Sequence, residues 1–218
     1  MERLTAGSPA PTHDLIRLRE PIALMADGPV PAWVEAALRR APWVVVRRGH
    51  VRDEMLPVGV RGLTRSQRFA AFVAVAEIAD RLSPEDLTDS GYIIEQKRKD
   101  AAPALAALAR VAHILVRHRL RWGPAGSVGF EIATGTATAT ASSDLDLILR
   151  QDRRLEPNIA TDLLAALAKA AAPARIDVML ETPIGGVALA DLAAKQVQLL
   201  VRTPCGPRLS VDPWKREG

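Results

Sequence analysis

Two patterns of hydrophobic and polar positions divide the chain into two parts. In the first part, short runs rich in β-branched residues are separated by polar turns, which is typical of strands. A short helix is predicted over residues 33–40, ending before Pro42, because proline cannot continue a helical pattern. The runs that predict strands are residues 12–18 (interpreted as a short edge strand), 43–47 and 56–62.

A longer helix is predicted over residues 64–82. Thr64, followed three residues later by Gln67, has the form of a capping box, in which two side chains satisfy backbone N–H groups of the first turn. Ser83 followed by Pro84 predicts the start of a further helix. Apolar residues recur along one side of the expected long helix, as an amphipathic helix requires; they are Phe69, Phe72, Val73, Ala76 and Ile78.

The second part of the chain follows a polar stretch, and we place a domain boundary there, between residues 92 and 93. Residues 1–92 are expected to form a smaller α+β domain, and residues 93–218 a second domain in which strands and helices alternate. Helices are predicted over residues 103–118 and 158–171. The strands expected around them are residues 129–133, 145–149, 176–180 and 197–202. The expected fold class is α/β (α+β).

Composition limits the classes to which the protein can belong. The 218 residues include 29 Lys and Arg against 25 Asp and Glu, a formal net charge of +4. This balance permits a polyanionic partner, but aromatic residues at 4% leave little for base stacking, so nucleic acid is not an expected partner. The one cysteine, Cys205, excludes a disulfide framework or a multi-cysteine zinc site. Without a long apolar run or an apolar signal core, we expect a cytoplasmic protein that does not bind membranes.

Three aspartates provide the strongest chemical signal. Asp144 and Asp146 flank Leu145, so on a strand both carboxylates point to one face while Leu145 enters the core. Asp177 lies on the strand expected over residues 176–180, which a helix connects to the first strand. If the two strands are neighbours in one sheet, the three carboxylates converge on one point.

Converging carboxylates repel one another unless a cation neutralises them, and hard oxygen ligands favour Mg²⁺ or Mn²⁺. Such an ion is suited to phosphoryl transfer. Upstream, Gly126 and Ser127 are predicted to bind a phosphate through backbone N–H groups, since glycine permits close approach. Taken alone, Asp144 and Asp146 also suit the solvated face of an edge strand. The Gly-Ser pair and Asp177 favour the metal site.

At these residues the chain resembles the DNA polymerase β-like nucleotidyltransferase superfamily, which pairs a Gly-Ser motif with Asp-x-Asp and a later acidic strand residue. The 16 residues between Ser127 and Asp144 exceed the usual spacing, and the extra length falls in a Thr- and Ala-rich stretch. A narrower resemblance, to malonate decarboxylase holo-acyl-carrier-protein synthase (phosphoribosyl-dephospho-CoA transferase), accounts for this length. Its strings are HDL (13–15), LPVGVRG (56–62), RSQR (65–68), WGPAGSVGFEIATG (122–135), SDLDL (143–147), ETPIGGVAL (181–189), RTPCGPRL (202–209) and DPW (212–214).

This resemblance implies a nucleotidyltransferase-like mixed sheet with helices in the C-terminal half. It also implies transfer of the phosphoribosyl-dephospho-CoA group from 2′-(5″-triphosphoribosyl)-3′-dephospho-CoA to a serine of the apo acyl carrier protein subunit of malonate decarboxylase, with release of diphosphate. Asp144 and Asp146 match the family's metal-binding, catalytic pair. Superfamily geometry adds Asp177 as a further metal ligand.

Three arginines form a candidate cationic patch. Arg61, at the end of an expected strand, and Arg65 and Arg68, one helical turn apart, are predicted to hold the dephospho-CoA phosphates or an acidic carrier protein. An ordinary solvated helix face is the alternative. Two other functions remain open at this point: another metal-dependent nucleotidyltransferase using ATP or CTP, and a non-catalytic basic module that binds nucleic acid.

Overall fold

A computed structural model describes residues 10–21, 24–51, 53–64, 66–89 and 94–215. The contacts between residues divide the chain into two compact units: Met1–Ser83 with Ala133–Thr136, and Pro84–Ile132 with Ala137–Gly218. The predicted boundary between residues 92 and 93 lies outside the described residues. In the described part of the chain, no helix combines the length and the apolar character that a bilayer span requires.

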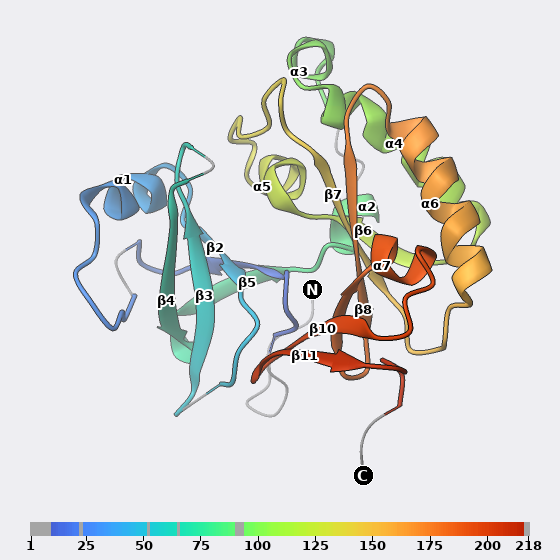
Figure 1. The fold of residues 1–218 in the computed structure, drawn as a ribbon. Coiled ribbons are helices and arrows are strands. Elements are labelled where there is room, and N and C mark those ends of the chain that lie inside the picture. Colours follow the sequence, from blue (N-terminus) through green and yellow to red (C-terminus); the bar gives the residue numbers. More distant parts are fainter. Residues whose placement is uncertain (1–9, 22–23, 52, 65, 90–93, 216–218) are drawn as a thin grey trace. The chain divides into compact units, whose positions relative to one another are not determined.

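The first unit contains a five-stranded antiparallel sheet in the order β4-β3-β2-β1-β5 (Figure 1). The predicted helix over 33–40 and the strands over 43–47 and 56–62 are confirmed to within about two residues at each end. The prediction of an edge strand over 12–18 is wrong in its position, because β1 lies between β2 and β5. The elements are β1 (Leu15–Leu18), α1 (Ala32–Arg40), β2 (Trp43–Val46), β3 (Met55–Arg61), β4 (Arg68–Ala74), the 3₁₀ helix η1 (Val75–Glu77) and β5 (Ile78–Leu82).

The predicted helix over residues 64–82 is wrong: this segment forms β4, η1 and β5. One half of the predicted capping box forms, since Gln67 Oε1 accepts hydrogen bonds from Leu63 N at 2.9 Å and Thr64 N at 3.3 Å. The other half does not, because Gln67 N donates to the Thr64 carbonyl at 3.1 Å and Thr64 Oγ1 contacts Ser66 Oγ at 3.0 Å. Here the Gln67 contacts close the turn between β3 and β4. β4 then pairs with β3 along seven residues, and Val73 enters the core. The extended pairing outweighs the local helical signal.

A buried ion pair joins the edge of the first unit's sheet to its interior. The Asp14 side chain is fully buried and accepts a hydrogen bond from Nε of Arg81 on β5. Asp14 precedes β1, and its carbonyl accepts a hydrogen bond from Val46 N on β2 at 2.8 Å. Because burying a carboxylate is costly, the ion pair with Arg81 offsets part of the cost of placing Asp14 here.

The second unit contains a mixed six-stranded sheet in the order β11-β10-β9-β8-β7-β6 (Figure 1). Only β7 and β8 are parallel, and the other neighbouring pairs are antiparallel. This confirms the predicted α+β class with a mixed sheet. The strands are β6 (Arg121–Pro124), β7 (Leu145–Arg150), β8 (Ile176–Thr182), β9 (Gly185–Ala188), β10 (Leu199–Thr203) and β11 (Gly206–Ser210).

The helices of the second unit cover the two faces of its sheet unequally. Helices α4, α6 and α7 pack on one face, where Leu145, Leu147 and Leu149 of β7 are buried. α5 lies on the other side of β7 from α4 and α6 (Figure 1). The predicted helices over 103–118 and 158–171 are confirmed. The helices are α2 (Asp86–Asp89), α3 (Gln96–Ala101), α4 (Pro103–Arg117), α5 (Gly126–Thr134), α6 (Pro157–Ala171) and α7 (Leu189–Ala193).

The predicted strand over residues 129–133 is also wrong, since these residues belong to α5. Six consecutive residues of this helix, from Ser127 to Ile132, are buried. A helix buried on nearly all sides has no amphipathic stripe, so the alternation of Phe130 and Ile132 resembles that of a strand. The strand that precedes β7 is instead β6. The elements β9, α7 and β11 have no counterpart among the predicted helices and strands.

Candidate active site

The parallel pair β7 and β8 brings two of the three predicted aspartates together. Asp146 and Asp177 are register partners on these neighbouring strands, each the second residue of its strand. Register partners project from the same face of a sheet, so both carboxylates lie on the face opposite the buried Leu147 and Val178. β7 lies between β6 and β8 and is not an edge strand. The structure therefore rules out the interpretation of this motif as a solvated edge.

Gly126, the first residue of α5, lies directly against Asp146. The neighbouring Ala125 N donates a hydrogen bond to the Asp146 carbonyl at 2.8 Å. Gly126 has a φ of +57°, and a Cβ at this position would lie 1.7 Å from Asp146 Oδ2. Only glycine accommodates both the left-handed backbone and this approach. The structure thus places the N-terminus of α5, where backbone N–H groups favour anions, beside a carboxylate of the candidate site.

Asp144 stands one residue before β7 and is paired with an arginine that the sequence analysis did not assign. Arg175 Nε donates a hydrogen bond to Asp144 Oδ1 at 3.0 Å, and the Arg175 carbonyl accepts one from Leu145 N at 2.8 Å. The Arg175 side chain is 79% exposed, against 20% for Asp144. An ion pair whose arginine is this exposed contributes little to stability. A cation at Asp144 would therefore displace Arg175 at small cost.

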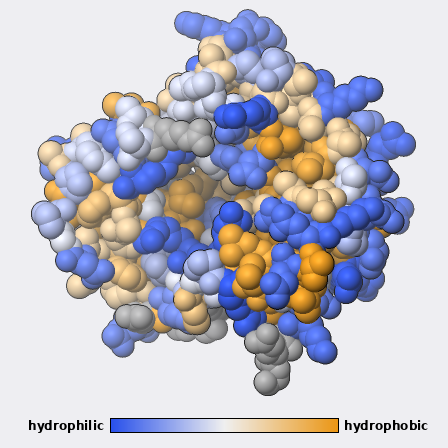
Figure 2. Space-filling model, viewed as in Figure 1, coloured by the Kyte–Doolittle hydropathy of each residue, from blue (hydrophilic) through white to orange (hydrophobic). Residues whose placement is uncertain are grey.

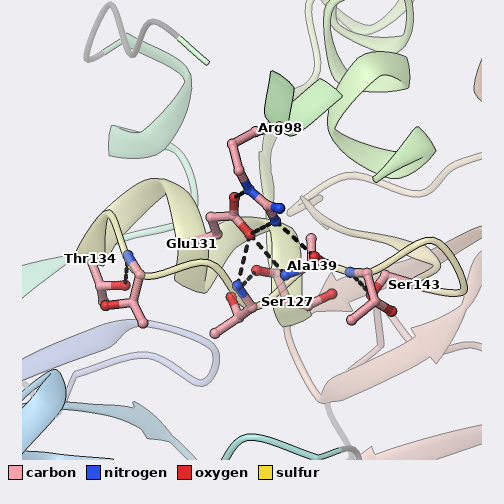
Figure 3. Close-up of polar contacts among 9 residues, drawn as sticks. Arg98, Ser127, Glu131, Thr134, Ala139 and Ser143 are labelled. Carbon is pink, nitrogen blue, oxygen red and sulfur yellow. Dashed lines mark hydrogen bonds and ion pairs between the residues drawn. The ribbon is translucent and has the colours of Figure 1, made fainter. Parts of the chain in front are cut away.

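Glu131 of α5 anchors the loop that leads from this helix towards β7 (Figure 3). Its Oε1 accepts a hydrogen bond from Arg98 Nε at 2.7 Å, and its Oε2 accepts one from Arg98 Nη2 at 2.9 Å. Oε2 also accepts hydrogen bonds from Thr138 N and Ala139 N, each at 2.8 Å. Arg98 Nη2 donates a further bond to the Ala139 carbonyl at 2.8 Å. A bidentate arginine pair of this kind fixes both direction and distance.

The same loop is attached to the first turn of α5. Thr138 Oγ1 donates a hydrogen bond to the Ser127 carbonyl at 2.9 Å, and the side chain of Ser127 is buried. Further along, Thr140 N donates to Ser143 Oγ at 2.9 Å, immediately before Asp144. The long Thr- and Ala-rich stretch is therefore an organised segment in its second half, and it links the position of Asp144 to α5.

Electrostatics favour the charged form of the Glu131–Arg98 pair. Burial alone would raise the pKa of Glu131, but the hydrogen bonds from Arg98 and from the backbone of Ala139 and Thr138 outweigh it, and the pKa lies below its ordinary value. The hydrogen bond to Glu131 raises the pKa of Arg98. Both groups are therefore charged at neutral pH, and Glu131 serves as a structural anchor rather than as a proton donor.

The donor set fits a hard divalent cation in part. No group of three or more His, Cys, Asp or Glu side chains within the described residues is arranged to hold a metal ion. Mg²⁺, however, is commonly bound through one or two carboxylates, with waters and substrate phosphates completing its coordination. Asp144, one residue before β7, and Asp146, on β7, suit that mode. The full metal set of Asp144, Asp146 and Asp177 stays a prediction.

Two of the three predicted phosphate-binding arginines belong to the first unit's sheet. Arg61 and Arg68 are register partners at the end of the β3–β4 hairpin, and Arg68 Nη1 donates to the carbonyls of Thr64 and Gln67. The prediction that Arg61 ends a strand is confirmed, whereas the helix expected to carry Arg65 and Arg68 is wrong, because Arg68 begins β4. Arg65 lies outside the described residues. The role of the three in phosphate binding stays a prediction.

Comparison with known proteins gives consistent matches. The model of the phosphoribosyl-dephospho-CoA transferase MdcG C-terminal domain matches residues 92–213, and that of the N-terminal domain matches residues 11–84. A phosphoribosyl-dephospho-CoA transferase of Pseudomonas putida (strain W619) is 40% identical over 208 residues, which are 95% of this chain and 96% of the relative. No solved structure matches the chain.

Two further relatives with the same name are similar over most of their length. That of Azotobacter vinelandii (strain DJ) is 42% identical over 192 residues, 87% of this chain and 88% of the relative. That of Pseudomonas aeruginosa (strain PAO1) is 39% identical over 203 residues, 93% of each chain. The similarity therefore extends through both units and is not limited to the residues around Asp144 and Asp146.

Proposed function

The chain belongs to the phosphoribosyl-dephospho-CoA transferase family and is a transferase, and from that premise we propose its full reaction. The protein transfers the phosphoribosyl-dephospho-CoA group of 2′-(5″-triphosphoribosyl)-3′-dephospho-CoA to a serine of the apo acyl carrier protein subunit of malonate decarboxylase. Diphosphate is the leaving group. We further propose that the reaction takes place in the cytoplasm.

The observation that supports this proposal is the contact between Gly126 and Asp146. It places the amino end of a nine-residue helix beside a carboxylate that is in register with Asp177. A helix amino end favours phosphate oxygens, and carboxylates favour a divalent cation. A polyphosphate bound together with such a cation satisfies both groups. If the amino end of α5 only bound the Asp146 carboxylate, a second carboxylate in register with it would not be needed.

The proposed step is an in-line displacement at the α-phosphorus of the triphosphate. The acceptor serine Oγ forms the new P–O bond, the bond from the α-phosphorus to the bridging oxygen of the β-phosphate breaks, and the serine proton is released to solvent. The product is a phosphodiester. In such a reaction the protein contributes mainly positioning and charge stabilisation. Backbone N–H groups at Gly126 and Ser127 orient the phosphates, and the Glu131 anchor holds that turn in place.

We assign Mg²⁺ or Mn²⁺ to Asp144 and Asp146, with Asp177 as the additional ligand. When bound, the ion supplies positive charge that neutralises the substrate phosphates. Arg175, which pairs with Asp144 through a largely exposed side chain, is the residue that such an ion would displace. The carboxylates of Asp144 and Asp146 supply the oxygen ligands that attract the cation to this face of the sheet.

Intact-mass spectrometry of the apo carrier subunit tests the proposal. We expect incubation with this protein, Mg²⁺ and the triphosphoribosyl precursor to add one phosphoribosyl-dephospho-CoA unit to the carrier. A chelator should abolish this mass shift. Asp146→Asn should slow the transfer by about a hundredfold or more, because loss of charge stabilisation at the reacting phosphate has effects of this size. The matched control is Asp152→Asn, since that side chain is 88% exposed and lies after β7.

Three outcomes would contradict parts of the proposal. Transfer at the wild-type rate by folded Asp146→Asn would remove the metal assignment. Consumption of ATP or CTP on another acceptor, with no change in the carrier, would keep a nucleotidyltransferase and discard the substrate. Salt-sensitive binding of RNA or DNA that survives Asp146→Asn, without any transfer, would support a binding module instead.

A further inference from the structure

The sheet of the second unit has one face that α4, α6 and α7 do not cover, and Asp146 and Asp177 project from it. The register extends this face across the sheet, because Arg150 pairs with Glu181, Glu181 with Gly186, Gly186 with Arg202, and Arg202 with Pro207. Arg150 and Asp146 are both on one face of β7, since they are four residues apart on a strand. Arg202 on β10 therefore shares a face with the candidate active site. Its Nη1 also contacts Met179 Sδ on β8 at 3.5 Å.

An apolar patch lies further along the same face, on the β10–β11 hairpin. Leu200 and Leu209 are register partners, and Leu200 is two residues from Arg202. Val211 follows two residues after Leu209. These side chains are 39%, 61% and 68% exposed, and we call them the hairpin patch. Together with Val197 they account for four of the ten large hydrophobic side chains exposed in the described residues.

This concentration of apolar surface is visible in the space-filling view. Figure 2 shows hydrophobic residues gathered over the region where β10 and β11 lie in Figure 1, with hydrophilic residues around them. Contiguous exposed apolar surface with a polar rim is typical of a protein interaction site. Single exposed hydrophobic residues, such as Val116 on α4, require no such explanation.

The hairpin patch is close enough to the aspartates for one protein to reach both. Leu200 is on β10, two strands from β8, which corresponds to about 10 Å across the sheet. It is offset from Asp177 by about two residues along the strands, a further 7 Å or so. Leu200 and Asp177 are thus about 12 Å apart, a distance that two turns of a helix on a partner protein would span.

The charge around the hairpin selects the kind of protein that fits. Apart from Arg208, which is on the other face of the sheet, residues 195–215 contain three cations, Lys195, Arg202 and Lys215, against one carboxylate, Asp212. That carboxylate is itself paired with Arg154 at 3.4 Å. The region is therefore positive, and complementary charge steers association towards acidic proteins.

We propose that the hairpin patch is the docking surface for the acceptor protein, an acidic protein that presents apolar side chains about two helical turns from its acceptor serine. This inference rests on the proposed function, because that function requires a protein serine to approach substrate held at Asp144 and Asp146. The patch is on the same face of the same sheet as those aspartates. A protein seated on the hairpin thereby directs its serine towards them.

Steady-state kinetics with two matched pairs of variants test the proposal. We expect the double variant Leu200→Ser/Leu209→Ser, and separately Arg202→Glu, to raise KM for the acceptor protein by about tenfold or more, as loss of a central contact does. KM for the triphosphoribosyl precursor should stay within about twofold. The apolar control is Val116→Ser, which is 66% exposed on α4. The charge control is Arg208→Glu, which is in the same hairpin but pairs with the buried Val201 on the other face.

A binding measurement separates failure of this inference from failure of the proposed function. Apo acceptor protein is titrated into the Asp146→Asn protein, with and without the hairpin substitutions, and folding is checked by circular dichroism. Binding that the hairpin variants weaken supports docking even where no transfer is seen, in which case the proposed reaction alone has failed. Unchanged acceptor binding and KM in the folded hairpin variants would overturn the docking surface. A change only in oligomeric state would overturn it in favour of a second copy of the chain.

Discussion

Replacing Gly126 by alanine tests the contact between the first residue of α5 and the Asp146 carboxylate. The added Cβ would lie 1.7 Å from Asp146 Oδ2 and 2.7 Å from its Cγ, so the carboxylate must rotate away. The left-handed backbone adds about 1–2 kcal/mol of strain for alanine. A less flexible unfolded chain offsets about 0.4–1 kcal/mol of this. Moving Asp146 off its rotamer costs about 0.5–1.5 kcal/mol more. We expect a total loss of about 2 kcal/mol.

Gly135→Ala provides the matched control. Gly135 has a φ of +67°, close to the +57° of Gly126, and nothing lies within 4 Å of its added Cβ. Its alanine variant therefore carries the backbone strain alone, about 1 kcal/mol net. Urea unfolding of the two variants should differ by about 1 kcal/mol. Because a displacement of about 1 Å at a catalytic group can cost a hundredfold in rate, transfer to the carrier should fall about that much in Gly126→Ala only.

Two results would contradict the role given to the contact between Gly126 and Asp146. If Gly126→Ala retains the transfer rate of Gly135→Ala, the position of the Asp146 carboxylate against α5 has no part in the reaction. If the two variants unfold at the same urea concentration, the Asp146 carboxylate moves away from position 126 without a cost in stability. The stability comparison does not depend on the identity of the substrate, so it tests the geometry even where no transfer is measured.

Two further variants test the anchoring ion pairs. Glu131→Gln should lower the free energy of unfolding by about 2 kcal/mol at pH 7. Because the pKa of Glu131 is lowered in the folded state, this loss relative to wild type should be full above the unfolded pKa of about 4.3 and should disappear as the pH falls through the folded pKa. Urea unfolding of both proteins from pH 3 to 7 measures it. An unchanged difference at pH 3 would contradict this. Asp14→Asn should cost about 3 kcal/mol because Arg81 loses its buried partner, whereas Asp80→Asn, at a longer and partly exposed pair with Arg17, should cost under about 1 kcal/mol. Equal unfolding midpoints for these two variants would show that burial of Asp14 is not decisive.

The carboxylates and their supporting strands were predictable from the sequence because the signal there is local and redundant. Buried leucines alternate with Asp144 and Asp146, and the helix that follows, now α6, has the length that a parallel crossover needs. Alternation fixes the face, and the crossover fixes the neighbouring strand. Together they predict that Asp146 and Asp177 share a face, which the register confirms.

The errors occurred where tertiary contacts override a local pattern. The hydrogen bond from Thr64 N to Gln67 Oε1 forms in this hairpin turn as it would at a helix start, so pairing with β3 decides between the two structures. α5 is buried on nearly all sides, so its sequence has no polar stripe to reveal a helix.

The Arg98–Glu131 pair was missed because the two residues are 33 positions apart, and Glu131, although it lies in the string WGPAGSVGFEIATG (122–135), had been placed on an expected strand. Had residues 126–134 been interpreted as a helix, Glu131 would have fallen one turn after Ser127. That placement would have marked it as a candidate to brace the Gly-Ser turn.

Asp146 and Asp177 stand at the amino ends of the parallel strands β7 and β8. The chain at the opposite ends of these strands should therefore tolerate insertions better than the chain beside the aspartates. β7 continues for four residues beyond Asp146, so its carboxyl end is about 13 Å from that carboxylate. The connection from β7 to α6, residues 151–156, begins at that far end and includes exposed side chains from Asp152 to Arg154. A peptide epitope or a spectroscopic probe inserted there would leave the aspartates undisturbed.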